Sequence, residues 1–562
     1  MHNWLISKIR VGLGYILKNK KLFFILLFAL ILRVIGISYS LPLVFNVDEP
    51  SFVRTVIALR HDISPHRFDW PHLHFYLNLI LYVIIVILQN ILKILGLQNA
   101  ASSIFPLFFN NPGIFYLTSR LFNAILGTLT IIPLYLSARI LFKEKKYALY
   151  TSLLFSVFPY HIIESHLALL DVAMTFWVTW FVYISLLITK KPTYKRFLLS
   201  GIFMGLAFAT KYTAFFYYLF FALCSWYSIK STKYKIKKYF SRYYIKGYLI
   251  SLLSFLSVFL ITNFSIFFEP KLFFSNQYGR GFLFVFSNAG NKGWSEYPFS
   301  LFENFYTQGI SDYGLSIYVF ILLAFILFLF FNYRKKQTYL TILLPLFVFF
   351  YFSGKDRSPS HYFVFIYPLI ALFVIQVLHD LSKKIYDTKI LFAKIVKKLI
   401  SNKKPNFIAN IYYLLSIQNI FIILFILAII SPLYKSIKNT YLYSQPDTRY
   451  LTYNWIAKNL SKSDTLYYYG DDLLMIPFDN VESKLVKQLD ENEINFDKTP
   501  FYLLIGVEDL QYSDIMTGDM DTKLVKGGMD KFLRGADLEL YLDNTNRYGP
   551  PIYLFKVKNV KD

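Results

Sequence analysis

The sequence predicts an all-α polytopic membrane domain followed by a small α/β domain. The chain is 56% hydrophobic, above the roughly 45–50% that soluble domains average, and its mean hydropathy is +0.43. The apolar residues also gather in long runs, several of which reach the ~20 residues that a helix needs to cross the hydrocarbon core. Composition and patterning together therefore indicate a multi-pass membrane protein.

About eleven of these runs are candidate transmembrane helices. They cover residues 21–41, 115–142, 146–163, 172–189, 197–211, 213–229, 246–268, 313–333, 338–353, 361–379 and 407–432. Residues 72–95 are apolar enough to span as well, but counting them would place the basic residues 143–146 outside. We therefore interpret 72–95 as a helix on the outer face of the membrane.

The net charge of +25 reflects membrane topology. In a soluble protein such an excess would suggest nucleic acid, but here the basic residues occupy alternate short loops. Those loops are 143–146, 190–196, 230–246, 334–336 and 383–404. Lys/Arg-rich loops stay cytoplasmic, so the protein is predicted to lie in the cell membrane with its N-terminus on the cytoplasmic side. We expect membrane lipids as neighbours and no nucleic acid as a partner.

The N-terminal run has a second interpretation as a signal peptide. A basic start and an apolar stretch fit one loosely, but no small-residue cleavage site follows Ser38-Tyr39-Ser40. We favour a retained membrane anchor. The single cysteine, Cys224, lies inside a predicted span, so no disulfide is expected.

Beyond the membrane domain, residues 1–435, the pattern changes. Residues 448–460 have apolar positions at helical spacing. Short strands are predicted at 465–470, 500–507, 538–542 and 552–557. Residues 436–562 are therefore predicted to form a soluble α/β domain, which is extracytoplasmic because eleven spans that start inside end outside.

Charged side chains gather at the predicted outer ends of the spans. They are Asp48, Glu49, Arg120, Glu164, His166, Asp171, Lys211, Arg357 and His361, with further charges in loop 268–312. Buried charge is costly in a membrane protein and marks functional sites. We expect an outward-facing cleft that holds carboxylates beside cations at the depth of a lipid headgroup.

Each of these residues also has a structural interpretation. Asp48 and Glu49 precede Pro50 and could cap a helix, as could Asp171. Lys211 and Arg357 could snorkel to lipid phosphates. His166 and His361 could be packed interfacial histidines. No metal-binding spacing and no nucleotide-phosphate loop is present, so no cofactor is assigned and a divalent metal stays possible.

The motifs resemble those of GT-C glycosyltransferases that use polyprenyl-phosphate sugars, among them protein O-mannosyltransferases and lipid A aminoarabinose transferases. Asp48-Glu49 is similar to the family's acidic motif in the first outer loop. Glu164-Ser-His-Leu-Ala-Leu-Leu-Asp171 resembles its second acidic motif, although an arginine usually replaces His166. GIFMGLAFATK (201–211), RSPSHYFVFIYP (357–368) and the start of the C-terminal domain at Asp447-Thr-Arg have counterparts too.

The resemblance implies sugar transfer from a polyprenyl-phosphate donor to a protein, lipid or glycan acceptor. Asp48 would then be the base or the carboxylate that orients the acceptor, supported by Glu49, and Asp171 would shape the site. Lys211, Arg357 and Arg120 would hold the donor phosphate, and His166 and His361 would line the site. The sequence departs from the family at Trp70-Pro71-His72, where relatives often have Lys-Pro-Pro, and Arg67 is the cation available to substitute.

Two further functions compete with the transferase. A transporter or flippase of lipid-linked sugars would place its polar groups near the bilayer midplane and in repeated halves, whereas here they lie at the outer ends and no repeat is visible. A non-catalytic scaffold that binds glycan through its outer domain is the third. Loss of activity in a folded carboxylate variant would separate the transferase from both.

Overall fold

The computed structural model describes most of the chain. The described residues are 19–96, 103–230, 242–287, 292–293, 295–330, 336–356, 358–399, 416–470, 473, 476–479, 481–486, 493–495, 500–506 and 536–558. They form two compact units. The helical unit contains Phe52–Leu107 and Thr118–Asn439, and the sheet unit contains Ile35–Ser51, Phe108–Leu117 and Thr440–Asp562. Two short segments from early in the chain thus belong with the C-terminal sheet.

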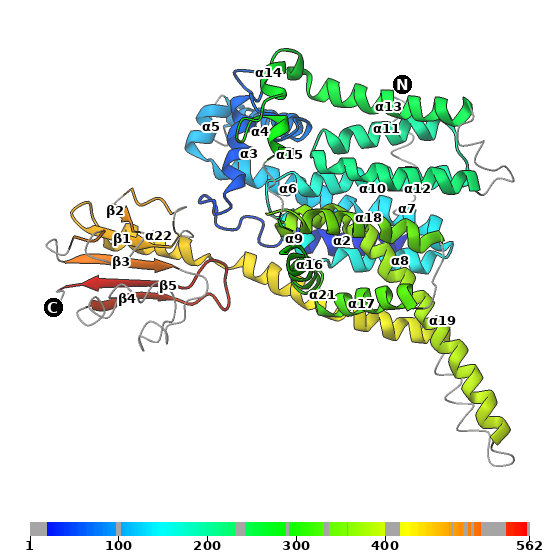
Figure 1. The fold of residues 1–562 in the computed structure, drawn as a ribbon. Helices are drawn as coiled ribbons and strands as arrows, with labels where there is room; N and C mark the ends of the chain where they lie inside the picture. The colour runs from blue at the N-terminus through cyan, green and yellow to red at the C-terminus, as the bar shows by residue number, and fades with distance from the viewer. Residues whose placement is uncertain are drawn as a thin grey trace. The chain divides into compact units, whose positions relative to one another are not determined.

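The first half of the chain is helical throughout its described regular elements (Figure 1). They are α2 (Lys20–Val34), α3 (Asp48–Ala58), α4 (Leu73–Ile94), α5 (Ile104–Asn110), α6 (Gly113–Leu129), α7 (Ile131–Phe142), α8 (Lys145–Ser156), α9 (Pro159–Ser165), α10 (Asp171–Lys190), α11 (Tyr194–Phe208), the 3₁₀ helix η1 (Tyr212–Phe216), α12 (Tyr217–Lys230) and α13 (Arg242–Thr262).

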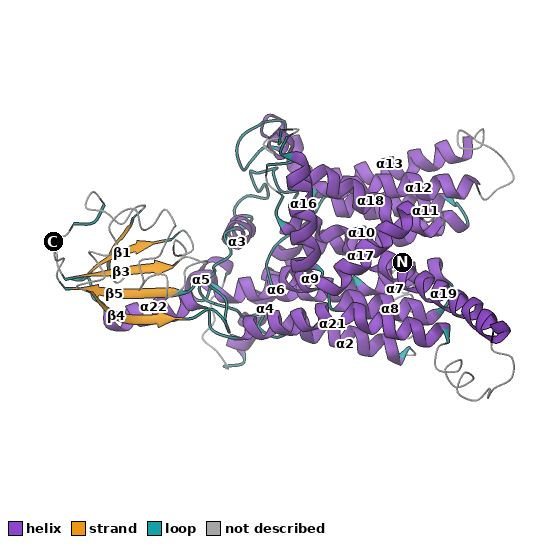
Figure 2. Ribbon diagram, turned by 60° about the horizontal axis from the view of Figure 1, so that its bottom comes forward, coloured by secondary structure: helices purple, strands orange, loops and turns teal. Residues whose placement is uncertain are grey.

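The helices continue to the start of the sheet. They are η3 (Phe264–Phe267), α14 (Pro270–Phe273), α15 (Phe282–Ser287), α16 (Tyr297–Thr307), the π-helical turn η4 (Gln308–Asp312), α17 (Leu315–Phe330), α18 (Lys336–Ser353), η5 (Ser360–Ile366), α19 (Tyr367–Leu399), α21 (Ile417–Ser444) and α22 (Thr448–Asn459). Helices α10, α11, α12 and α13 lie side by side in both ribbon views (Figures 1 and 2).

Six helical segments among the described residues are long and apolar enough to cross a membrane. They are Leu73–Ile94, Gly113–Phe142, Asp171–Lys190, Arg242–Thr262, Ser360–Thr388 and Ile417–Asn459. The protein is therefore a multi-pass membrane protein, while the count of about eleven spans stays a prediction. Leu73–Ile94 meets the same criterion, so our placement of 72–95 on the outer face also stays a prediction.

One predicted span is broken in the middle. Instead of a continuous helix over 146–163, α8 ends at Ser156 and α9 begins at Pro159. Proline has no backbone N–H and clashes with the preceding turn, so it is tolerated only at the start of a helix. The break leaves α9 as a separate short helix that carries Glu164.

The glycines of the 201–211 motif have a packing role. A Cβ added at Gly201 would lie 2.1 Å from the carbonyl oxygen of Ser251, and one at Gly205 would lie 2.7 Å from the Cβ of Val258. Ser251 and Val258 are on α13, so the two glycines let α11 and α13 approach closely. Small residues four apart are used in this way between membrane helices.

The sheet unit contains a five-stranded mixed sheet in the order β2-β1-β3-β5-β4 (Figure 1). Its strands are β1 (Thr465–Tyr469), β2 (Glu482–Leu485), β3 (Phe501–Gly506), β4 (Ala536–Leu542) and β5 (Ile552–Val557). The helix predicted over 448–460 is confirmed as α22, and the four predicted strands are confirmed as β1, β3, β4 and β5. Strand β2 was missed because its sequence, ESKL, has three exposed residues and no apolar alternation.

Candidate functional site

Asp171 and Lys211 form an ion pair. The Nζ atom of Lys211 donates to Oδ1 of Asp171 at 2.7 Å, and the two side chains are 17% and 6% exposed. A close pair with so little water around it is only weakly screened. The structure therefore joins two of the residues that the sequence singled out, one from each of two separate motifs.

Local structure explains why these two residues meet. Asp171 is the first residue of α10, where the positive end of the helix dipole favours a carboxylate. Lys211 has an extended backbone between α11 and η1, and its N–H donates to the carbonyl oxygen of Ala207 at 2.9 Å. The chain thus leaves the α11 axis at Lys211, which frees the side chain to reach a neighbouring helix.

The 357–368 motif also reaches this pair. Nζ of Lys211 lies 5.3 Å from the ring centroid of Tyr362 in η5, within the range of a cation–π contact. The hydroxyl of Tyr217 donates to the carbonyl oxygen of Phe365 at 2.6 Å and ties η5 to α12. Segments from α10, α11 and η5, far apart in the sequence, therefore converge on one ammonium group.

Glu164 adds a second carboxyl group beside the pair. It is 3% exposed, and its Oε2 has no hydrogen-bond partner among the described residues. Burial, and next the negative charge of Asp171, raise the pKa of the Glu164 carboxyl to about 8. At neutral pH Glu164 is therefore a mostly protonated acid beside the Asp171–Lys211 pair.

Two further contacts fix the loop between α9 and α10. The side-chain amide of Asn123 on α6 donates to the carbonyl oxygens of Leu167 and Leu169, both at 2.7 Å. His166 is 1% exposed, and its Nδ1 donates to the carbonyl oxygen of Ile162 at 2.8 Å. These bonds hold the turn that presents Asp171, so a packing role of His166 is visible here, whereas its role in lining the site stays a prediction.

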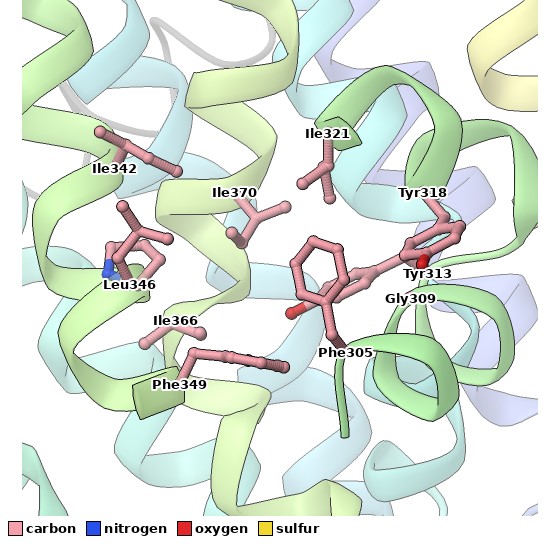
Figure 3. A pocket seen from close by; sticks show the side chains of 11 residues that line it. Phe305, Gly309, Tyr313, Tyr318, Ile321, Ile342, Leu346, Phe349, Ile366 and Ile370 are labelled. Carbon is pink, nitrogen blue, oxygen red and sulfur yellow. The ribbon is translucent and has the colours of Figure 1, made fainter. Parts of the chain in front are cut away.

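An apolar groove with a cavity volume of about 50 Å³ lies further along η5 (Figure 3). Its lining comes from α16, η4, α17, α18, η5 and α19: Phe305, Gly309, Tyr313, Tyr318, Ile321, Ile342, Pro345, Leu346, Phe349, Ile366 and Ile370. Ile366 lies four residues after Tyr362 in η5, which is roughly 8 Å along a 3₁₀ helix. One short helix thus contributes to both the ammonium site and the groove.

Asp48 and Glu49 belong to the sheet unit, whereas Asp171 and Lys211 belong to the helical unit. The side chain of Asp48 is exposed and that of Glu49 is buried. The helix cap is Asn46, whose Oδ1 accepts from the backbone N–H groups of Asp48 at 3.0 Å and Glu49 at 3.2 Å. Asn46 therefore caps the first turn of α3, and whether Asp48 or Glu49 adds a second cap stays a prediction.

The remaining predicted residues have different outcomes. Arg120 is buried in α6, 1% exposed, and His361 lies beside Tyr362 in η5 with ring centroids 4.7 Å apart. Arg357 lies outside the described residues. Arg67, the substitute cation, is engaged in its own loop by Asp69, with Nε to Oδ1 at 2.8 Å. The assignment of Arg120 and Arg357 to the donor phosphate stays a prediction.

The loop before α4 is tied to the helices around Lys211. The hydroxyl of Tyr212 donates to the carbonyl oxygen of Phe68 at 2.8 Å. On the same loop His66 bridges two carboxylates, with Nε2 2.8 Å from Oδ2 of Asp62 and Nδ1 2.9 Å from Oε2 of Glu269. Hydrogen bonding, first to Glu269, raises the pKa of His66. We call this group of three side chains the His66 bridge.

Sequence reasoning noted Glu164 but gave it no role, and it missed Tyr362 at the ammonium group. Glu164 could have been found from its place seven residues before Asp171 in the same motif. Tyr362 gave no signal, because one tyrosine among 46 is not distinctive. Within the described part of the chain no group of three or more His, Cys, Asp and Glu is placed to hold a metal ion.

The comparisons with known proteins agree with these motifs. Residues 112–261 match the family model described as dolichyl-phosphate-mannose-protein mannosyltransferase. That range includes Glu164, Asp171 and Lys211. The chain resembles GT-C glycosyltransferases. No curated protein sequence matches it.

Solved structures of this kind are similar over most of the chain. ArnT from Cupriavidus metallidurans bound to undecaprenyl phosphate has 13% identity and a TM-score of 0.49, covering 95% of this chain and 97% of that one. AglB, the oligosaccharyltransferase of Archaeoglobus fulgidus, in complex with an inhibitory peptide and a dolichol-phosphate, has 13% identity and a TM-score of 0.42, covering 95% and 74%.

The Pmt1-Pmt2 protein O-mannosyltransferase complex of S. cerevisiae, bound to the sugar donor, has 23% identity and a TM-score of 0.31, covering 45% of this chain and 34% of that one. TM-scores below 0.5 do not establish a shared fold by themselves. The family match over residues 112–261 is the firmer comparison, and it confirms the resemblance predicted from the motifs.

Proposed function

We propose that this protein is an integral membrane glycosyltransferase that moves a sugar from a polyprenyl-phosphate donor to a hydroxyl group of a protein, lipid or glycan acceptor on the outer face. The observation that supports it most is the Asp171–Lys211 pair, a little-exposed ammonium inside the residues that match the mannosyltransferase family model. Similar proteins were solved with undecaprenyl phosphate and with dolichol-phosphate.

Lys211 suits a phosphate that leaves with growing negative charge. An ammonium has three N–H donors, and the bond to Asp171 occupies one of them. The group can therefore hold Asp171 and a phosphate oxygen together, with Arg357 and Arg120 as further cations. Because Glu164 is mostly protonated at neutral pH, it adds no second negative charge to repel the donor. The apolar groove along η5 offers a surface for the isoprenoid chain.

The transfer needs one proton acceptor. The acceptor hydroxyl gives its proton to Asp48 as its oxygen bonds to the sugar C1 atom, and the bond from C1 to the phosphate oxygen breaks. Polyprenyl phosphate leaves and is stabilised by the cations. Glu49 supports Asp48, Asp171 orients Lys211, and His166 and His361 line the site. Whether a divalent metal takes part is tested with a chelator in the assay below.

Incubation of the purified protein with a panel of polyprenyl-phosphate sugars and acceptors tests the proposal. We expect release of polyprenyl phosphate, and its near loss in Lys211→Ala. The matched control is Lys146→Ala, which removes a lysine paired with Glu144 at 3.0 Å on an exposed surface and should retain activity. Movement of a lipid-linked sugar across vesicles without any transfer would instead identify a transporter.

We also propose a membrane topology with about eleven transmembrane helices, a cytoplasmic N-terminus and an extracytoplasmic domain over residues 436–562. Lys-rich loops stay inside, so a reporter fused at Lys235 should be cytoplasmic and one at Pro500 external. Both fusions reporting the same side would exclude this arrangement.

A further inference from the structure

The segment that carries Asp48 is built into the C-terminal part of the chain. Residues 35–51, which we call the Asp48 segment, share the sheet unit with Thr440–Asp562. Phe45 is 7% exposed. It belongs to the hydrophobic core formed by the C-terminal helix and strands, with Ile456, Leu460, Leu466, Leu504, Ile552 and Leu554. The ring of Phe45 is thus part of the core of a domain whose other core residues lie some 400 positions or more further along the sequence.

A polar cluster anchors the same segment a second time. Arg449 holds the carboxylate of Asp447 with two bonds, Nε to Oδ1 at 2.9 Å and Nη2 to Oδ2 at 2.8 Å. The hydroxyl of Tyr39 donates to Oδ2 of the same carboxylate, and Nη2 of Arg449 lies 3.4 Å from that hydroxyl. The guanidinium carbon of Arg449 lies 4.2 Å from the ring centroid of Phe45. Arg449 therefore contacts the Asp48 segment at both anchors.

The packing around Tyr39 leaves little freedom. Its ring contacts Tyr443 and Tyr548, with centroid distances of 4.9 and 5.6 Å. A Cβ added at Gly36, whose φ is +78°, would lie 2.6 Å from backbone and side-chain atoms of Tyr443. Only glycine accepts that φ and that proximity together. The backbone of the Asp48 segment is therefore pressed against the C-terminal domain.

Two residues, Asn46 and Val47, separate the anchor at Phe45 from Asp48. Between them, the Oδ1 atom of Asn46 accepts from the N–H groups of Asp48 and Glu49 and fixes the start of α3. The position and direction of the Asp48 carboxylate are therefore set by a short, capped connection that begins inside the core of the C-terminal domain.

We infer that the C-terminal domain is a positioning device for Asp48, with Arg449 and Phe45 as the positioning residues. This inference rests on the proposed function, in which Asp48 takes the acceptor proton. A displacement of about 1 Å at a reacting group can cost roughly a hundredfold in rate. Loosening the anchors should thus lower kcat while the donor KM, which depends on the cations of the helical unit, changes little.

The test uses Arg449→Ala, Phe45→Ala and the milder Phe45→Leu and Tyr39→Phe in the full-length protein. For the two alanine variants we expect kcat to fall about ten- to a hundredfold with donor KM within about twofold of wild type, and Phe45→Leu to restore most of the loss. The matched control is Lys556→Ala, which removes a lysine 5.3 Å from the ring of Tyr502 in the same domain.

A second measurement, the mobility of a spin label near Asp48, does not depend on sugar transfer. Val47 is 70% exposed, and Cys224 is the single cysteine of the chain and is buried. A spin label on Val47→Cys in a Cys224→Ser background should become more mobile in Arg449→Ala but not in Lys556→Ala.

The outcomes separate the two proposals. Increased mobility with no transfer in the wild type would remove the proposed function and leave the anchoring intact. Transfer in the wild type, with kcat and label mobility both unchanged in folded Arg449→Ala and Phe45→Ala, would overturn the inference. If an alanine variant does not fold, Tyr39→Phe and Phe45→Leu decide by the same two measurements.

Discussion

The two acidic motifs of this protein are held by different means. Asp171 is at the start of a long buried helix and is paired with Lys211 at 2.7 Å, so its position and charge depend on packing inside the helical unit. Asp48 is exposed on a short segment, and its position depends on the distant C-terminal domain. The difference predicts that changes at Asp171 affect stability and activity together, whereas a change at Asp48 affects activity alone.

The largest effect is expected from Asp48→Asn. The amide has the shape of the carboxylate but cannot take up the acceptor proton near neutral pH, and a positioned base contributes at least about a hundredfold. Transfer should fall by about that factor while the thermal unfolding temperature stays unchanged. Release of polyprenyl phosphate and thermal unfolding are measured on the same preparation.

Asn46→Ala is the matched control, because it removes the cap of α3 and leaves Asp48 in place. Losing such a cap costs about 1 kcal/mol of stability. A stable Asp48→Asn protein with near-normal transfer would remove Asp48 as the base.

The second prediction concerns the ion pair. Lys211→Met leaves Asp171 buried without its partner, which should cost about 3–5 kcal/mol of stability. Loss of a charge-assisted bond to the donor, about 1.5–3 kcal/mol, should lower transfer roughly ten- to a hundredfold. The double variant Lys211→Met with Asp171→Asn should regain stability without regaining activity. Recovery of both in the double variant would show that Lys211 has only a structural role.

The third prediction uses the pH dependence of stability to distinguish the role of Glu164 from that of Asp171. The native protein keeps the Glu164 proton up to about pH 8, whereas the ordinary pKa of a glutamic acid side chain is 4.5. The folded state thus binds more protons than the unfolded chain in this interval, and stability falls as pH rises from about 4.5 to 8. Glu164→Gln should abolish that component, measured by denaturant unfolding across the range.

At neutral pH Glu164→Gln should transfer sugar nearly as well as wild type, because the amide replaces a neutral acid. Above pH 8 it should outperform wild type, in which an ionised Glu164 repels the donor phosphate. Asp171→Asn is the contrasting variant and should be poorly active at every pH. Equal loss of activity in both variants at pH 7 would mean that Glu164 acts as an ionised carboxylate.

The smallest effect is expected at the His66 bridge. The pKa of His66 is raised, so the bridge stabilises the fold when the imidazole is protonated, and this stability is lost as pH rises through that pKa. The side chains of His66 and Asp62 are more than half exposed, so water screens the pair and its contribution is small. His66→Gln should remove a small stability change that lies above the ordinary histidine pKa of 6.5. Identical profiles for the two proteins would leave the bridge without an energetic role.

Local sequence predicted much of the helical unit, because apolar runs and terminal charges mark helices and their ends. The motifs at 164–171 and 201–211 also singled out Asp171 and Lys211, but not the ion pair between them. The break at Pro159 and strand β2 were missed, the first because a proline at a helix start looks like part of an apolar run. The anchors of the Asp48 segment could not be predicted, since Tyr39 and Asp447 are 408 residues apart and such contacts leave no local pattern.

That separation has a consequence for how the protein is made. Synthesis at 5–20 residues per second takes roughly 20–80 s to travel from Tyr39 to Asp447, and only then does the polar cluster around Arg449 exist. Until that moment the nascent chain carries its first acidic motif without the domain that fixes it. Under the proposed function, a chain terminated ahead of Thr440 would lack both anchors of the Asp48 segment, so efficient transfer would begin only once the polypeptide is complete.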